Sequence, residues 1–255
     1  MTLKNKIVLI TGASSGIGEA CAKTFAKAGA NLILTARRKD RLDNLKKDIQ
    51  TECNINICNI QLDVRSYEDV EKQLDTLPNE FRNVDILINN AGKALGIEKI
   101  QDGLIENWEE MIDTNIKGLL YITRVVVPKM IERGIGHIIN IGSIAGHEVY
   151  IGGNVYCASK YAVKALSKGM LLDLNGTGIR VTSIDPGMVE TEFSIVRFKG
   201  NSKKASDVYK GFEPLTGENI ADIVLFAATR PSNVTLQTIV VTPTNQASVN
   251  VISRK

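Results

Sequence analysis

Thr11-Gly-Ala-Ser-Ser-Gly-Ile-Gly18 is the stretch of this 255-residue sequence that decides its fold. The apolar run Ile7-Val-Leu-Ile10 before it predicts a strand, and a helical pattern follows it to about Ala28. Its three glycines leave the turn without side chains, so the backbone can approach a pyrophosphate. The helix that follows adds free N–H groups and the positive end of its dipole. A strand, this turn and a helix in that order indicate a dinucleotide site rather than a purely structural turn.

The same alternation of strand and helix continues along the chain. Further β-branched runs predict strands at 32–35, 55–62, 84–88, 138–141, 180–184 and 238–241. Helical patterns lie between them, at 39–51, after Ser66, and at about 107–133 and 154–174. This alternation predicts a parallel sheet covered on both faces, and no linker divides the chain. We therefore expect a single α/β domain over residues 1–255, a doubly wound, Rossmann-like fold with a seven-stranded parallel sheet.

The segment 185–215 breaks this alternation. It is longer than ordinary connections in compact domains, and such segments are lids, binding loops or disordered insertions. It follows the C-terminal end of a predicted strand, which is the side where open α/β sheets bind ligands. We interpret it as a substrate lid, with a disordered surface insertion as the alternative.

Composition argues against several other functions. The net charge is only +3 and the 31 Lys and Arg residues are dispersed, so no nucleic-acid partner is expected. No apolar run reaches the roughly 18 residues of a membrane span, and no signal-peptide pattern is present, so we expect a cytoplasmic protein without a membrane partner. The two histidines and four cysteines lack metal-ligand spacing. No metal site is expected, and the cysteines are interpreted as buried, reduced side chains.

The end of the second predicted strand indicates which dinucleotide is bound. NAD sites place a carboxylate there for the ribose 2′-hydroxyl, whereas this chain reads Thr35-Ala-Arg-Arg38, with no acid before Asp40. Guanidinium groups suit a 2′-phosphate, which each can hold through paired N–H donors. The sequence therefore predicts NADP, bound by Arg37 and Arg38. The alternative is that both arginines only begin a solvated helix.

A second group of residues predicts acid–base chemistry. Tyr156-Cys-Ala-Ser-Lys160 places a phenol and an ammonium one helical turn apart on the same face. A nearby cation stabilises a phenolate, so we expect Lys160 to lower the pKa of Tyr156 from its usual value of about 10. Ser143 follows the fifth predicted strand, where its hydroxyl could polarise a carbonyl oxygen. A tyrosine–lysine pair alone could be a surface pair, but beside Ser143 and the glycine turn it indicates a catalytic site.

With these motifs the chain resembles the short-chain dehydrogenase/reductase family over essentially its whole length. Asn89-Asn-Ala-Gly92 is similar to the family's NNAG motif, Asp63 to its adenine-side aspartate, and 185–191 to its PG…T stretch beside the nicotinamide. The resemblance implies a catalytic tetrad of Asn115, Ser143, Tyr156 and Lys160. It implies NADP contacts from Gly12, Ser14, Ser15, Gly16, Ile17, Gly18, Arg37, Arg38, Asp63, Val64, Asn90, Ala91, Gly92, Tyr156, Lys160, Pro186, Gly187, Val189 and Thr191.

A closer resemblance is to the NADP-dependent 3-hydroxy acid dehydrogenases. It is carried by Met111-Ile-Asp-Thr-Asn-Ile-Lys-Gly118, Gly152-Gly-Asn-Val-Tyr156 and Val196-Arg-Phe-Lys-Gly200. This resemblance implies hydride transfer between NADP and the hydroxyl-bearing carbon of a small 3-hydroxy acid of the L-serine, L-allo-threonine or 3-hydroxypropionate type, or the matching carbonyl. It also implies a homotetramer.

Substrate contacts are expected from Ser143, Tyr156 and Arg197, with Arg197 on the carboxylate. A solvated or structural arginine on a mobile loop is the alternative for Arg197. Among other functions, a broad-specificity NADPH-dependent carbonyl reductase is the main competitor. A non-catalytic, cofactor-sensing protein would have lost a tetrad residue, and none is missing. A sugar-nucleotide epimerase of the extended type would need a larger C-terminal domain, and enoyl reductases have a longer Tyr–Lys spacing.

Overall fold

Seven short strands rich in β-branched residues pair in parallel in the computed structural model, which describes residues 3–255. The strand order is β3-β2-β1-β4-β5-β6-β7, and every neighbouring pair is parallel. The bounds are β1(Ile7–Thr11), β2(Asn31–Ala36), β3(Ile57–Gln61), β4(Ile86–Asn89), β5(Gly136–Ile141), β6(Ile179–Pro186) and β7(Thr238–Val241). The predicted doubly wound sheet is therefore confirmed.

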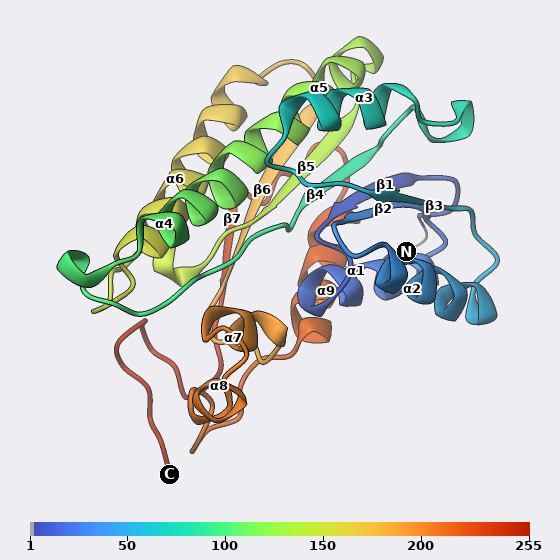
Figure 1. Cartoon of the computed structure of the whole chain (residues 1–255). Coiled ribbons are helices and arrows are strands. Elements are labelled where there is room, and N and C mark those ends of the chain that lie inside the picture. The colour runs from blue at the N-terminus through green and yellow to red at the C-terminus, as the bar shows by residue number, and fades with distance from the viewer. Residues whose placement is uncertain (1–2) are drawn as a thin grey trace.

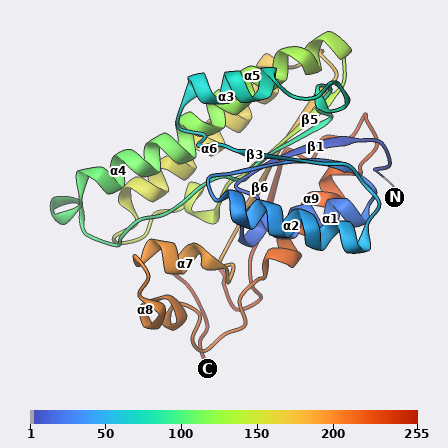
Figure 2. The same ribbon diagram turned by 45° about the vertical axis from the view of Figure 1, so that its right-hand side comes forward.

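Helices cover both faces of this sheet (Figures 1 and 2). One layer contains α1(Gly16–Lys27), α2(Lys39–Glu52) and α9(Gly217–Ala228). The other contains α3(Tyr67–Asp75), α4(Ile105–Ile112), α5(Gly118–Arg133) and α6(Asn154–Asp173). Short 3₁₀ turns lie at Asn79–Phe81, Ile100–Asp102 and Ile144–Gly146. Within residues 3–255, no helix has both the length and the apolar character needed to cross a membrane.

Strand β1 shows why both faces are buried. Its side chains alternate between the faces, so Val8 and Ile10 pack with the α1, α2 and α9 layer. Ile7 and Leu9 pack with α3 and α5 on the opposite side. All residues of β1 are buried, as expected for a central parallel strand with helices on both faces.

The predicted helix at 107–133 is interrupted in the structure. It begins at Ile105 and contains a π-helical turn at Asp113–Lys117 between α4 and α5. The widened turn carries Asn115, and such turns are frequent at functional sites. α5 ends at Arg133, and Gly134, which follows it, has a φ of 65°, the left-handed conformation that terminates helices.

The segment 185–215 is folded into two short helices, α7(Glu192–Arg197) and α8(Ser202–Asp207). The hydroxyl of Thr191 accepts a hydrogen bond from the backbone N–H of Phe193 at 3.2 Å and so caps α7. An isolated parallel β-bridge between Val189 and Leu215 joins the two ends of this segment. Both helices lie past the carboxyl ends of the strands, near the C-terminus of the chain (Figure 1).

Candidate active site

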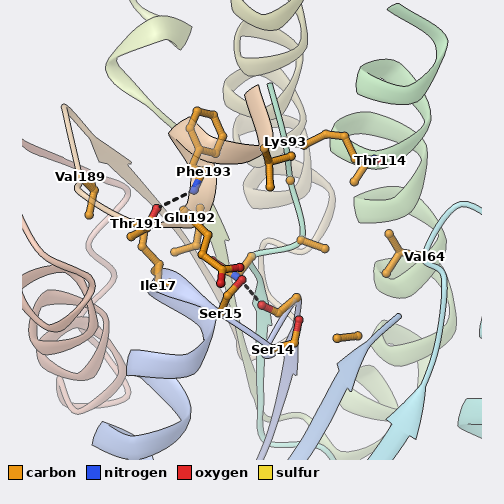
Figure 3. A pocket seen from close by; sticks show the side chains of 18 of the residues that line it. Ser14, Ser15, Ile17, Val64, Lys93, Thr114, Val189, Thr191, Glu192 and Phe193 are labelled. Atoms are coloured by element: carbon orange, nitrogen blue, oxygen red, sulfur yellow. Dashed lines mark hydrogen bonds between the residues drawn. The ribbon is translucent and has the colours of Figure 1, made fainter. Parts of the chain in front are cut away.

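A cavity of about 320 Å³ opens over the carboxyl ends of the strands. It lies where the strand order reverses between β1 and β4, the position at which open α/β sheets bind ligands. Its wall combines the glycine turn after β1, the ends of β2 to β6, the first turns of α6, and the start of α7 (Figure 3). Segments far apart in the sequence therefore form one site.

The glycine turn leaves room for backbone only. Gly12 and Gly16 have φ values of +65° and +57°, which side-chain-bearing residues rarely adopt. A Cβ at Gly18 would lie 2.4 Å from both Asn90 Nδ2 and Gly12 O. The Asn90 amide donates to the carbonyls of Thr11 at 2.9 Å and Gly12 at 3.1 Å, which fixes the turn against β4. This bare cradle at the start of α1 fits the pyrophosphate of a dinucleotide.

Arg38 lies over this turn at the end of β2. Its Nη2 donates to Ser14 Oγ at 3.0 Å and to Ser15 Oγ at 2.9 Å, and its Nη1 donates to Glu192 Oε2 at 3.0 Å. Arg37 also lines the cavity and is exposed. The Arg38 guanidinium beside two serine hydroxyls, with Arg37 also on the cavity wall, suits a phosphate group, which matches the predicted NADP.

Asp63 and Val64, after β3, line the cavity next to the end of β2. Arg65 donates hydrogen bonds to the Asp63 carboxylate from Nη2 at 2.7 Å and from Nε at 3.0 Å. Lys93, which was not predicted, also lines the cavity (Figure 3). It donates a hydrogen bond to Glu110. Asp63 and Lys93 on the cavity wall are therefore each paired with an oppositely charged side chain, Arg65 or Glu110, that does not itself line the cavity.

Ser143, Tyr156 and Lys160 meet on the far side of the cavity. Ser143 follows β5, and its Oγ accepts from the N–H of Ala145 at 3.1 Å. Tyr156 and Lys160 occupy the first two turns of α6, with Lys160 Nζ 6.0 Å from the centre of the Tyr156 ring. Lys160 is buried and donates to the carbonyl of Ile141 at 2.9 Å.

The pKa of Tyr156 differs from the sequence-based expectation. Burial of the phenol raises its pKa, Tyr150 adds to this effect, and the hydrogen bond with Ser143 and the charge of Arg197 lower it by less. Burial likewise lowers the pKa of Lys160 to about 8, against an opposing contribution from Asp185. Lys160 therefore does not bring the pKa of Tyr156 below its usual value in this structure, because burial outweighs the charges around the phenol.

Asn115 reaches the site indirectly, from the π-helical turn. Its Nδ2 donates to Lys93 O and to Ser159 Oγ, both at 2.9 Å, and its Oδ1 accepts from Lys93 N at 2.9 Å. A Cβ at Gly92 would lie 3.4 Å from Asn115 Oδ1 and 3.7 Å from Lys160 Nζ. The amide thus fixes the backbone next to Lys160 without lining the cavity itself.

Arg197, at the end of α7, lies behind the tyrosine. Its Nε donates to Gly96 O at 3.0 Å, and its Nη1 donates to Tyr150 Oη at 2.8 Å. Its guanidinium carbon is 5.9 Å from the centre of the Tyr156 ring. Nη2 is buried and has no hydrogen-bond partner among the described residues.

The structure brings nearly all predicted site residues to one cavity. Three predicted residues do not line it: Gly18 packs beneath the turn, Asn115 acts through backbone, and Arg197 lies behind Tyr156. The cavity wall is formed by Gly12, Ser14, Ser15, Gly16, Ile17, Arg37, Arg38, Asp63, Val64, Asn90, Ala91, Gly92, Ser143, Tyr156, Lys160, Pro186, Gly187, Val189 and Thr191, with the unpredicted Thr35, Ala36, Leu62, Lys93, Thr114, Ile141, Gly142, Glu192, Phe193 and Val196.

Fold and cavity together define a dinucleotide-dependent oxidoreductase. Residues 6–201 match the short chain dehydrogenase family, and the chain belongs to this family. The NADP-dependent 3-hydroxy acid dehydrogenase YdfG of Salmonella typhi is 47% identical over 242 residues, which cover 94% of this chain and 96% of that protein. The NADP-dependent 3-hydroxy acid dehydrogenase of Schizosaccharomyces pombe is 43% identical over 254 residues, covering 99% and 98%. The closed form of a serine dehydrogenase complexed with NADP⁺ aligns with a TM-score of 0.92 at 46% identity, covering 98% of this chain and 99% of that one.

Proposed function

We propose that this chain is an NADP-dependent dehydrogenase of small 3-hydroxy acids, of the L-serine, L-allo-threonine or 3-hydroxypropionate type, and of the matching carbonyl compounds. Arg197 carries the proposal. Its Nη2 is buried and unpaired, and its guanidinium stands 5.9 Å from the ring of the predicted acid–base residue Tyr156. A buried N–H group without a partner is costly, and a carboxylate is the partner that suits a guanidinium best. The similarity to two 3-hydroxy acid dehydrogenases supports the same substrate class.

The proposed cofactor is NADP, whose nicotinamide accepts or supplies the hydride when bound. Arg37 and Arg38 would hold its 2′-phosphate, with Ser14 and Ser15 beside them. The bare turn of Gly12, Gly16 and Gly18 would hold the pyrophosphate. The other predicted cofactor contacts complete the same wall.

Tyr156 would transfer the proton, and three other side chains would assist it. In oxidation, the Tyr156 oxygen takes the proton from the substrate hydroxyl, and in reduction it returns that proton to the carbonyl oxygen. Ser143 donates a hydrogen bond to the same substrate oxygen and so stabilises its developing charge. Lys160 places a positive charge next to Tyr156, and Asn115 holds the backbone beside Lys160.

Segment 185–215 would serve as the substrate lid. It contributes Thr191, Glu192, Phe193 and Val196 to the cavity wall. The ring of Phe193 packs edge-on against Tyr156 with centroids 5.7 Å apart. Movement of α7 would therefore expose or cover the reacting tyrosine. The cytoplasmic location and the homotetramer stay predictions.

The test is to measure NADPH formation with a panel of substrates. The panel compares L-serine, L-allo-threonine and 3-hydroxypropionate with neutral alcohols of similar size. We expect higher kcat/KM for the acids. Equal or higher values for neutral alcohols, with good reduction of neutral ketones, would instead identify a broad-specificity carbonyl reductase.

A further inference from the structure

A second buried charge lies close to Lys160 and takes no part in the mechanism above. Asp185, near the end of β6, has a side chain that is only 1% exposed. Its Oδ1 lies 2.0 Å from the point where a Cβ would stand on Gly142, so the carboxylate fills the space that this glycine leaves. Lys160 Nζ donates to the carbonyl of Ile141, the preceding residue. The ammonium and the carboxylate therefore border the same stretch of backbone.

Two donors hold Asp185. Ser183 Oγ donates to Oδ1 at 2.6 Å, and His147 Nε2 lies 2.5 Å from Oδ2. The Nζ of Lys164 lies 3.0 Å from the other ring nitrogen of His147, Nδ1. An ammonium can only donate, so Nδ1 accepts and Nε2 carries the proton given to Asp185. Hydrogen bonds to a carboxylate stabilise its charged form.

His147 also separates Asp185 from water. Its side chain is 27% exposed, whereas the carboxylate behind it is almost inaccessible. Water that reached Asp185 would screen its charge and weaken its field at Lys160. The imidazole therefore acts as both a donor and a cover.

Lys160 has no ion pair with an acidic side chain anywhere in the part of the chain that the structure describes. We propose that Asp185 is a positioning residue for Lys160: a buried carboxylate, held by Ser183 and covered by His147, that keeps the ammonium charged beside Tyr156.

The balance at Lys160 makes this contribution important. Burial lowers the pKa of Lys160 to about 8, and Asp185 is the charge that opposes this shift. Without Asp185, burial would act alone and Lys160 would lose its proton at a lower pH. The titratable groups around this centre come from several elements: Asp185 on β6, His147 after β5, Tyr156 and Lys164 on α6, Tyr150 before α6, and Arg197 on α7.

The test measures the titration of Lys160 directly, without using activity. Protein labelled with ¹³C-lysine gives one Cε resonance per lysine, and the Lys160→Arg variant identifies the resonance of Lys160. In the unmodified protein this resonance should titrate near pH 8. In Asp185→Asn the midpoint should fall by roughly one pH unit, the lower end of the effect of a nearby opposite charge.

Two variants of His147, with a control at the other histidine, separate the electrostatic role from a structural one. His147→Ala opens Asp185 to water, so it should lower the midpoint of Lys160, but by less than Asp185→Asn does. His147→Gln keeps an N–H donor and much of the cover, so its midpoint should stay close to that of the unmodified protein. His137→Gln is the control. It changes the other histidine, on β5, whose Nε2 lies 2.8 Å from the hydroxyl of Thr182 on β6, and it should leave the midpoint of Lys160 unchanged.

An unchanged midpoint in a folded Asp185→Asn variant would overturn the proposal. If Asp185→Asn does not fold, the His147→Ala variant provides the test. An unchanged midpoint of Lys160 in that variant would also overturn the proposal. The consequence for catalysis rests on the proposed function: the pH at which turnover declines on the alkaline side should move with the midpoint. The titration itself does not depend on substrate, so a wrong substrate class and a wrong role for Asp185 give different results.

Discussion

Arg38 donates a hydrogen bond from Nη1 to Oε2 of Glu192 at 3.0 Å, across 154 positions of sequence. The same carboxylate receives Nη1 of Arg41 at 2.6 Å. The hydrogen bond from Arg41, together with that from Arg38, holds the pKa of Glu192 below its usual range. The residue predicted to bind the 2′-phosphate is thus tied to the first turn of α7, so cofactor binding and the position of the proposed lid share one side chain.

The first prediction is that Arg37 and Arg38 determine the preference for NADP(H). Losing a hydrogen bond to a charged group costs about 1.5–3 kcal/mol, or roughly ten- to a hundredfold in affinity. Replacing both arginines by alanine should weaken NADPH binding by this factor and leave NADH binding nearly unchanged. Quenching or enhancement of nicotinamide fluorescence measures both constants.

Arg41→Ala is the matched control for this prediction. Arg41 shares Glu192 with Arg38 but does not line the cavity, so its loss should preserve the preference for NADPH. Equal affinities of the unmodified protein for NADPH and NADH would contradict the assignment.

The second prediction concerns Tyr156. Tyr156→Phe keeps the ring that packs on Phe193 but removes the transferable proton. Turnover should fall by roughly a hundredfold or more, as for other acid–base residues, while NADPH binding persists. Tyr67→Phe removes a phenol whose hydroxyl bonds Glu71 on the surface, and its turnover should be normal. Near-normal turnover of Tyr156→Phe would assign the proton transfer to another group.

The sequence predicted the site well where function depends on local pattern. The strand, the glycine turn and the helix are contiguous, and Tyr156 and Lys160 are one helical turn apart, so their proximity follows from helical geometry. Strand β7 has the bounds that were predicted from Thr238 and its neighbours. These features need no knowledge of the rest of the chain.

Contacts between distant segments were not predictable in this way. Glu192 gave no signal before the fold brought α7 over Arg38, and Tyr150 gave none before it was seen to hold Arg197. Helix α9 was missed although Thr216 and Asn219 form a reciprocal cap at its start, a signal that sequence can carry. The π-helical turn around Asn115 depends on packing that no sequence period records.

The third prediction is a pH dependence that differs with the direction of the reaction. Oxidation needs Tyr156 without its proton, and burial raises its pKa, so the active fraction increases as the pH rises. Reduction needs the protonated phenol, which is the dominant form below that pKa. Initial rates from about pH 6 up to the pH near 8 at which Lys160 begins to lose its proton should therefore rise for oxidation and stay level or fall for reduction. Parallel profiles in both directions would show that another group limits the rate.

The fourth prediction is a homotetramer. The outer faces of α5 and α6 expose apolar side chains, among them Leu172, which is 65% exposed, and Ile131. Such faces are typical of helices that pack against another subunit. Light scattering should show a mass about four times that of the 27.8 kDa chain. Leu172→Arg should shift this mass downward, and a species of monomer mass in the unmodified protein would refute the prediction.

The last prediction tests Arg197 as the group that binds the substrate carboxylate. Two of its nitrogens are occupied, Nε by Gly96 O and Nη1 by Tyr150, so the guanidinium is fixed and the buried Nη2 is left without a partner among the described residues. Arg197→Ala should raise KM for L-serine or 3-hydroxypropionate by roughly ten- to a hundredfold, because the carboxylate loses a charge-assisted hydrogen bond.

Three comparisons make this result specific. A neutral alcohol, if it is accepted as a substrate, should be affected much less by Arg197→Ala, since it has no carboxylate to lose. Lys199→Ala removes an exposed cation two positions away and should leave KM for the acids nearly unchanged. Arg197→Lys keeps the charge without the planar fork and should recover only part of the affinity. If Arg197→Ala keeps normal kinetics with the acids, or loses acids and neutral alcohols equally, Arg197 supports the structure of the lid and does not bind the carboxylate.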